Sequence, residues 1–285
     1  MATRNSTERV SLGDGDDEPS DGRFRLAVAV YAGALVAGVV SIAAVLTALV
    51  PGDLPVVYAV GFAGGFVGGL ALASVDPRLP SRLGRSLVRR VALVAPAFPV
   101  LFGWFVLLES TVGFVVLWSA LAVFSSGYVL SQLAGNRYVD AITAGEPDER
   151  WRWEPASSAV LDGVIAGLWA LLAVGNVAVG NSLEALVWLL MAVGWIASGL
   201  AEGRWSFGPG RERCEVQLYE RGLVKRRPYT KEFVPWREIG HVRLREDELV
   251  LDRGLRDVRF DREELEDADA LLEALDRHLE TAGGR

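Results

Sequence analysis

Cysteine, histidine and lysine are scarce in this chain of 285 residues. The single cysteine, Cys214, excludes an internal disulfide, and two histidines, His241 and His278, are too few for a histidine-rich metal site. Only Lys225 and Lys231 are lysines, so arginine supplies nearly all the positive charge. Because 36 acidic residues outnumber 29 basic ones, no basic face dominates, and we expect no nucleic-acid partner.

The groups that enzymes use for chemistry are also missing from the apolar part of the chain. Its long apolar runs contain no histidine, lysine or cysteine, so their serines have no conventional base beside them. Neither a Walker loop nor a dinucleotide-binding fingerprint is present. We therefore expect a protein that is not an enzyme, without catalytic residues, cofactor or metal site.

Apolar residues, in contrast, are abundant and segregated. Hydrophobic residues make up 51% of the chain and charged residues 23%, with a mean hydropathy of +0.27. Six apolar runs are each about 20 residues long, the length at which a helix crosses a bilayer. Because a backbone in lipid must pair its own amides, the runs predict six transmembrane helices: 26–50, 56–75, 91–108, 112–133, 158–179 and 183–201.

The charges of the connecting segments predict the orientation. Residues 51–55, 109–111 and 180–182 contain no arginine or lysine, whereas the other two connections are basic. By the positive-inside rule the basic connections are cytosolic. We expect a multi-pass protein of the cell membrane with both termini in the cytosol, and tryptophans forming an aromatic belt on that side: Trp151, Trp153 and Trp205.

Within the membrane region, three features suggest roles. Glycines spaced four apart favour close packing of the second helix against a neighbour, or else a groove that admits a lipid or ligand: Gly61, Gly64, Gly65, Gly68 and Gly69. Asp162 lies about one turn inside the fifth helix, where it has either a structural, solvated role or a role in transport. Pro96 and Pro99 predict a kink in the third helix.

The chain ends differ in composition from the apolar centre. Residues 1–23 are acidic and lack apolar periodicity, which predicts a disordered cytosolic tail before the membrane domain of residues 24–202. Residues 203–210 form a linker to a cytosolic domain, residues 211–285. There, alternating apolar residues predict an antiparallel meander of six strands: 215–220, 223–227, 232–236, 241–245, 248–252 and 255–260.

A closing helix follows the strands. Asp261 and Glu264 have the spacing of a capping box, and one apolar stripe is expected to cover the sheet: Leu265, Ala268, Leu272, Leu275 and Leu279. This order, with Trp236-Arg237-Glu238-Ile239 before a strand pair, resembles the pleckstrin-homology-like (PH-like) domains of prokaryotic membrane proteins. The resemblance implies an α+β fold, a partly open barrel closed by one helix. Six strands are counted where that family has seven, so one is missing or hidden near Arg211.

The resemblance also implies a binding surface, because related domains bind phosphoinositides through basic residues around the first hairpin. The matching residues here are Arg221, Lys225, Arg226, Arg227 and Lys231. Alternate strand residues point to opposite faces, so ordinary surface charge is the other interpretation. The first hypothesis is a non-enzymatic membrane protein whose cytosolic module contacts anionic membrane lipids, a protein partner or a second copy of the chain. The alternative is a small transporter or permease with a regulatory cytosolic domain.

Overall fold

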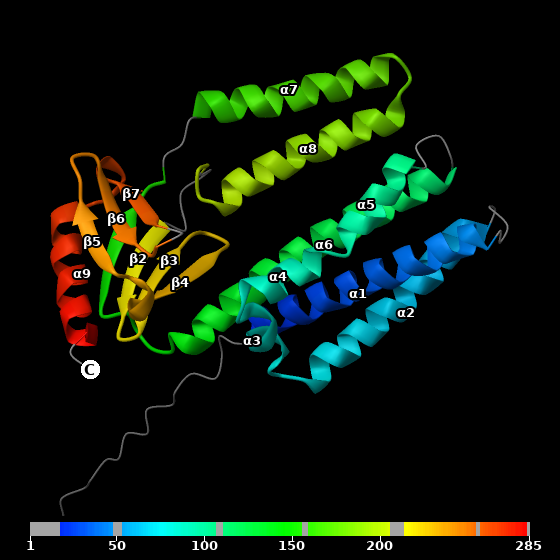
Figure 1. Ribbon diagram of the computed structural model, residues 1–285. Coiled ribbons are helices and arrows are strands. Elements are labelled where there is room, and N and C mark those ends of the chain that lie inside the picture. Colours follow the sequence, from blue (N-terminus) through cyan, green and yellow to red (C-terminus); the bar gives the residue numbers. More distant parts are fainter. Residues whose placement is uncertain are drawn as a thin grey trace, which may run out of the picture. The chain divides into compact units, whose positions relative to one another are not determined.

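A computed structural model describes residues 18–47, 53–106, 111–155, 159–205, 214–254 and 257–283. The chain divides into two compact units, residues 1–134 and 135–285. The first contains α1 (Glu18–Leu46), α2 (Leu54–Val75), α3 (Leu79–Gly84), α4 (Leu87–Val94), α5 (Ala97–Val106) and most of α6 (Thr111–Ile142). The second contains the end of α6, the remaining helices and all described strands (Figure 1).

The first helix begins earlier than the sequence predicted. Residues 18–23, assigned above to a disordered tail, form the start of α1. A proline near the start of a helix is common, because the first turn leaves its amide groups without a helical partner. The remainder of the predicted tail lies outside the described residues.

Five described helices are long and apolar enough to cross a membrane: Gly22–Val45, Leu54–Val75, Val115–Ile142, Val160–Ala178 and Glu184–Ala201. The third predicted run is divided into α4 and α5 at Ala95 and Pro96. Proline lacks an amide hydrogen and its ring collides with the preceding turn, so a break at this position has a clear cause. The predicted kink is therefore a complete interruption between two short helices.

The glycines of α2 separate into two groups. Gly61, Gly65 and Gly69 are buried against α1, and a Cβ added to Gly65 would lie 2.5 Å from the Ala32 carbonyl oxygen. Gly64 and Gly68 face open space, with no described atom within 4 Å of an added Cβ. Three of the five glycines therefore allow close packing against α1, whereas Gly64 and Gly68 lie on another face of α2 and meet no described atom there.

This difference predicts that substitutions at neighbouring glycines change stability by very different amounts. Gly65→Val should lower the free energy of unfolding by about 3 kcal/mol, because its side chain meets backbone atoms of α1 that cannot move aside alone. Gly64→Val, the matched control, should change it by less than about 0.5 kcal/mol. Reversible unfolding of the purified protein in mixed micelles measures both values. Equal losses in the two variants would contradict the packing shown here.

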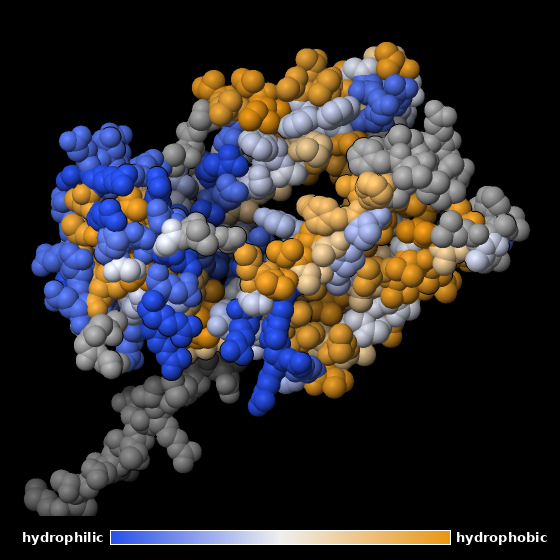
Figure 2. All heavy atoms as spheres, viewed as in Figure 1, coloured by the Kyte–Doolittle hydropathy of each residue, from blue (hydrophilic) through white to orange (hydrophobic). Residues whose placement is uncertain are grey.

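In the second unit, α7 (Ala159–Ala178) and α8 (Ser182–Ala201) form an antiparallel hairpin. Trp169 and Trp188 stack across it with ring centroids 5.3 Å apart, and Gly180 turns the chain with φ +83°. On the face shown in Figure 2, apolar side chains cover much of the long helices, and polar ones gather over the strands and α9 (Ala268–Gly283). The segregation inferred from composition is thus visible on the surface.

The strands form two antiparallel sheets. One has the order β1 (Glu149–Trp153), β2 (Cys214–Tyr219), β3 (Gly222–Arg226) and β4 (Lys231–Pro235). The other has the order β5 (His241–Leu244), β6 (Glu248–Asp252) and β7 (Val258–Asp261). With α9 (Ala268–Gly283) they enclose one apolar core, and together they are called the β-domain below. The six predicted strands are confirmed, and their ends differ from the prediction by at most three residues.

A seventh strand comes from a segment whose tryptophans predict a place at the membrane surface. β1 pairs with β2 along its whole length, so that Trp153 lies opposite Cys214. Trp153 is 4% exposed in the core of the β-domain, and Trp151 packs against that core. An aromatic belt is therefore wrong for these two tryptophans. The seventh strand precedes α7, so the α7–α8 hairpin is inserted between two neighbouring strands of one sheet.

The start of α9 also differs from the sequence prediction. Asp261 makes no capping hydrogen bond and ends β7, and a short 3-10 helix (Arg262–Glu264) follows. Asp267 caps α9 instead, with its Oδ1 accepting a hydrogen bond of 2.9 Å from the Ala270 amide. Glu264 accepts a 2.8 Å hydrogen bond from the Trp153 indole nitrogen. The expected capping box is therefore wrong, because both of its residues lie before the helix.

Candidate functional site

The five basic residues of the predicted binding surface do not form one patch. Arg221 lies in the turn between β2 and β3 and is exposed, whereas Lys225 is only 8% exposed near the other end of β3. Arg226 follows Lys225 in the strand, where successive side chains point to opposite faces. Strand geometry therefore disperses residues that are close in sequence.

Lys231 contributes to a contact with the end of α6. Its ammonium group forms an ion pair with Asp140 of α6. The Asn136 side chain accepts a 2.8 Å hydrogen bond from the Lys231 amide and donates one of 2.8 Å to the Tyr229 carbonyl. These bonds fix the β3–β4 turn to the last turns of α6. A headgroup-binding role for Lys231 is disfavoured, because its charge already has a carboxylate partner.

Lys225 has an unusual aromatic environment. Its Nζ lies 3.8 Å from the ring centroid of Trp153 and 4.5 Å from that of Phe260, and the two rings meet edge to face. Burial, reinforced by the nearby Arg227 charge, lowers the pKa of Lys225 to about 8. The ring faces attract the ammonium and replace part of its lost hydration. No carboxylate among the described residues is within ion-pair distance of this lysine.

Arg227 and Cys214 lie at the same end of the sheet. The Arg227 guanidinium carbon is 5.5 Å from the Trp153 ring centroid, and its Nε is buried without a hydrogen-bond partner in the described chain. The Cys214 thiol is buried, which raises its pKa, although the Arg227 and Lys225 charges act in the opposite direction. We define Lys225, Arg227 and the Trp153 ring as the aromatic-cation site.

The aromatic-cation site is adjacent to the hairpin in the chain and in space. Trp153 is the last residue of β1, after which the chain continues to α7. Cys214, directly opposite, is the first residue of β2, which follows α8. Gly203, two residues after α8, is so close to this end that an added Cβ would be 2.5 Å from Cys214 Sγ and 3.1 Å from Pro228. A membrane crossed by the hairpin would therefore have its surface close to Lys225 and Arg227.

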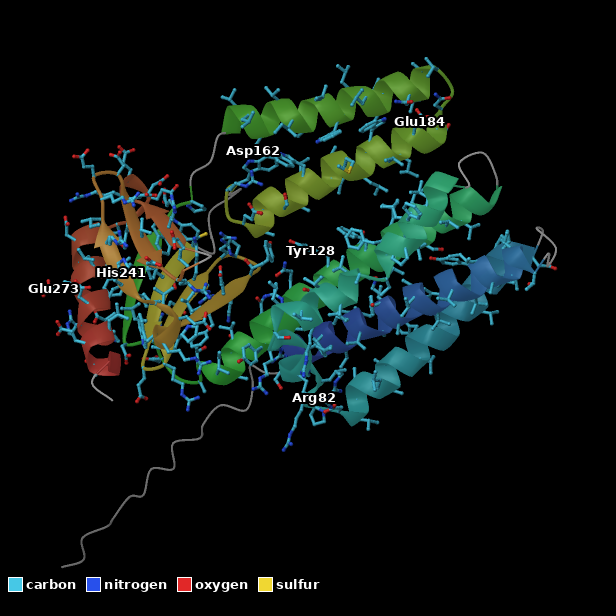
Figure 3. All side chains as sticks on the ribbon, viewed as in Figure 1. Arg82, Tyr128, Asp162, Glu184, His241 and Glu273 are labelled. Atoms are coloured by element: carbon cyan, nitrogen blue, oxygen red, sulfur yellow. The ribbon has the colours of Figure 1, made fainter. Side chains whose placement is uncertain are left out.

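Asp162 is buried near the start of α7 (Figure 3). Its Oδ1 accepts a 2.7 Å hydrogen bond from Arg204, and its Oδ2 accepts one of 2.9 Å from the Trp205 indole. The Arg204 guanidinium also lies 5.3 Å from the Trp195 ring centroid. Because both carboxylate oxygens are bonded, the geometry supports the structural role and disfavours transport. Trp205 is accordingly a hydrogen-bond donor to Asp162, a role that the sequence did not indicate.

The part of the chain that the structure describes holds no group of three or more His, Cys, Asp or Glu side chains that could bind a metal ion. Comparisons with protein-family models, with curated proteins and with solved structures found no match to this chain. The arrangement of its own residues is thus the basis for any functional conclusion. Its distinctive chemistry is a pair of cations that share one tryptophan ring beside a hairpin of membrane-spanning length.

Proposed function

We propose that this protein is a non-enzymatic, multi-pass protein of the cell membrane whose cytosolic PH-like β-domain binds the anionic headgroup of an inner-leaflet lipid. Five long helices are candidate spans, and α4 and α5 together would form a sixth, interrupted span, which supports six crossings. An even number returns the chain to the cytosol, in agreement with the arginines before α4 and α7. The PH-like assignment is supported by four plus three antiparallel strands and a single C-terminal helix.

The aromatic-cation site is the observation that carries this proposal. Two cations, Lys225 and Arg227, face the same ring, and neither has an ion-pair partner in the described parts of the chain. Burying such cations costs free energy unless an anion compensates them. The buried Arg227 Nε is a donor that requires an acceptor, and a lipid phosphate supplies acceptor oxygens at the membrane surface.

Lipid binding by the purified full-length protein tests this function. Native mass spectrometry should show retention of phosphatidylglycerol in preference to phosphatidylcholine. Because each charge-assisted hydrogen bond is worth about 1.5–3 kcal/mol, Lys225→Met with Arg227→Met should weaken phosphatidylglycerol binding at least about tenfold. Arg243→Gln on β5, which removes an exposed arginine from the other sheet, is the matched control and should bind like wild type. Equal binding by the double variant and wild type would refute the proposal.

The depressed pKa of Lys225 adds a pH signature. Below pH 8 the lysine is mainly charged, and above it the charge is lost, so phosphatidylglycerol affinity should fall between pH 7 and pH 9. The single variant Lys225→Met should lack most of this fall, because its side chain does not titrate. Surface plasmon resonance on captured full-length protein, at constant ionic strength, measures both dependences. An identical pH dependence in wild type and variant would assign the effect to other groups.

The transport alternative has less support, because the one acidic side chain buried in the hairpin is already bonded to Arg204 and Trp205. Flux of solutes into vesicles that contain the protein would nevertheless favour it. If the aromatic-cation site instead binds a protein partner or a second copy of the chain, that protein complex should persist in phosphatidylcholine without any anionic lipid.

A further inference from the structure

A polar cleft of about 750 Å³ lies at the other end of the β-domain. Asp148 precedes β1, and Glu220 and Arg221 follow β2, so these cleft residues lie at the strand ends opposite Trp153 and Cys214. The 3-10 helix Trp236–Glu238 contributes Trp236 and Arg237, and α9 contributes Arg277 and His278. The cleft volume is in the range of small-molecule sites. It is separate from the aromatic-cation site, since the two share no residue.

The positive charge of the cleft is incompletely neutralised. Arg277 donates a 2.9 Å hydrogen bond to Glu149, and His278 Nε2 lies 3.6 Å from an Asp148 carboxylate oxygen. Arg221 and Arg237 are exposed in the cleft wall, and neither forms an ion pair with another described residue. Two guanidinium groups are thus available to an incoming anion, while Arg277 retains donors beyond the one bonded to Glu149.

The floor of the cleft is held rigidly. Trp236 is only 4% exposed, and its indole nitrogen donates a 2.9 Å hydrogen bond to the Tyr219 carbonyl. The His278 ring lies over it, with centroids 5.4 Å apart, and His278 Nδ1 is 2.9 Å from the Ala274 carbonyl oxygen. These contacts join three elements, β2, the 3-10 helix and α9, before any ligand arrives. A ligand therefore meets side chains that are already positioned, which reduces the ordering cost of binding.

We propose that this cleft binds a soluble, phosphorylated small molecule that also carries hydroxyl groups, such as a nucleoside diphosphate or a sugar phosphate. Planar guanidinium groups match phosphate oxygens in two-point hydrogen bonds, which favours phosphate as the anion. The carboxylates of Asp148 and Glu220 line the same cleft and disfavour a ligand that is anionic throughout, but they accept hydrogen bonds from hydroxyl groups. A soluble ligand is favoured because the cleft opens at the strand ends opposite those joined to the hairpin.

Calorimetric titration of the full-length protein in nanodiscs of phosphatidylcholine tests this inference. The probes are ADP, pyrophosphate and adenosine. ADP and pyrophosphate should bind, ADP more tightly, and adenosine should bind at least about tenfold more weakly than ADP, because it lacks the phosphates that the arginines require. Arg221→Gln and Arg237→Gln should each weaken ADP binding about tenfold or more. Arg243→Gln is again the matched control and should leave ADP binding unchanged.

Three results would overturn the inference: no heat with ADP or pyrophosphate at millimolar concentration, equal weakening by Arg243→Gln, or undiminished ADP binding by Arg221→Gln and Arg237→Gln. Retention of phosphatidylglycerol that is lost in Arg237→Gln, without binding of ADP, would assign the cleft to a lipid headgroup instead. The double variant Lys225→Met with Arg227→Met separates this inference from the proposed function. It should bind ADP like wild type even where its lipid binding is lost.

Discussion

A fragment of residues 211–285, the domain suggested by composition alone, is expected to be unfolded. It lacks β1, so the core would lose Trp153, which is 4% exposed and meets Phe260 at 5.4 Å between ring centroids. Removing a buried tryptophan side chain alone costs about 3–5 kcal/mol, and β2 would also lose its hydrogen-bonded neighbour. Because domains of this size are stable by only about 5–15 kcal/mol, losing the whole strand should abolish cooperative folding.

A spliced fragment provides the positive counterpart. Residues 144–155 joined to residues 214–283 by a short glycine-rich linker should fold, because Trp153 and Cys214 are directly opposite partners in the β1–β2 ladder. Opposite residues of antiparallel strands are only about 5 Å apart, a span that a hairpin loop closes readily. Thermal unfolding followed by near-ultraviolet circular dichroism distinguishes the two fragments. A cooperative transition in fragment 211–285 would show that β1 is dispensable. Trp153→Ala in the spliced fragment should lower its midpoint sharply.

Asp162→Leu is expected to destabilise the α7–α8 hairpin by about 3–5 kcal/mol, because two hydrogen bonds to a buried carboxylate are lost and each is worth about 1.5–3 kcal/mol. The Arg204 side chain is 21% exposed and would lose the carboxylate that accepts its 2.7 Å hydrogen bond. The Trp205 indole would lose its acceptor as well. Reversible unfolding in mixed micelles gives the difference in free energy between variant and wild type.

Two further variants make this experiment specific. Asp162→Asn keeps an acceptor oxygen but removes the charge, so its loss should be smaller than that of Asp162→Leu. Glu184→Gln is the matched control, because Glu184 is exposed at the opposite end of the hairpin (Figure 3) and should change stability by less than about 0.5 kcal/mol. A loss below about 0.5 kcal/mol in Asp162→Leu would contradict the structural role and return Asp162 to consideration as a transport residue.

The elements that the sequence predicted well are those whose stability is local or nearly so. Apolar runs about 20 residues long can pair their backbone amides only within a helix, and the run divided at Pro96 contains the one residue type that breaks this pairing. The six strands after α8 alternate in hydropathy and are joined by short turns, so their partners lie nearby in the chain. Each pattern lies within a window of a few dozen residues.

Tertiary structure alone decided the features that depend on distant partners. β1 has an alternating pattern, Arg150-Trp151-Arg152-Trp153, but nothing near it in sequence shows that its partner begins at Cys214, beyond two long helices. Likewise, helical spacing put all five glycines of α2 on plausible packing positions, whereas the location of α1 determined that Gly65 is buried and Gly64 is not.

The charged residues follow the same rule. The sequence named Asp162 and the basic residues around β3, but the contacts that define their roles come from Arg204, from Asp140 and from the Trp153 ring, each far along the chain. Residue type determined which groups carry charge and which segments avoid water. The folded chain determined which charges are neutralised, because an ion pair or a cation over a ring depends on distances of a few ångströms that local sequence does not set.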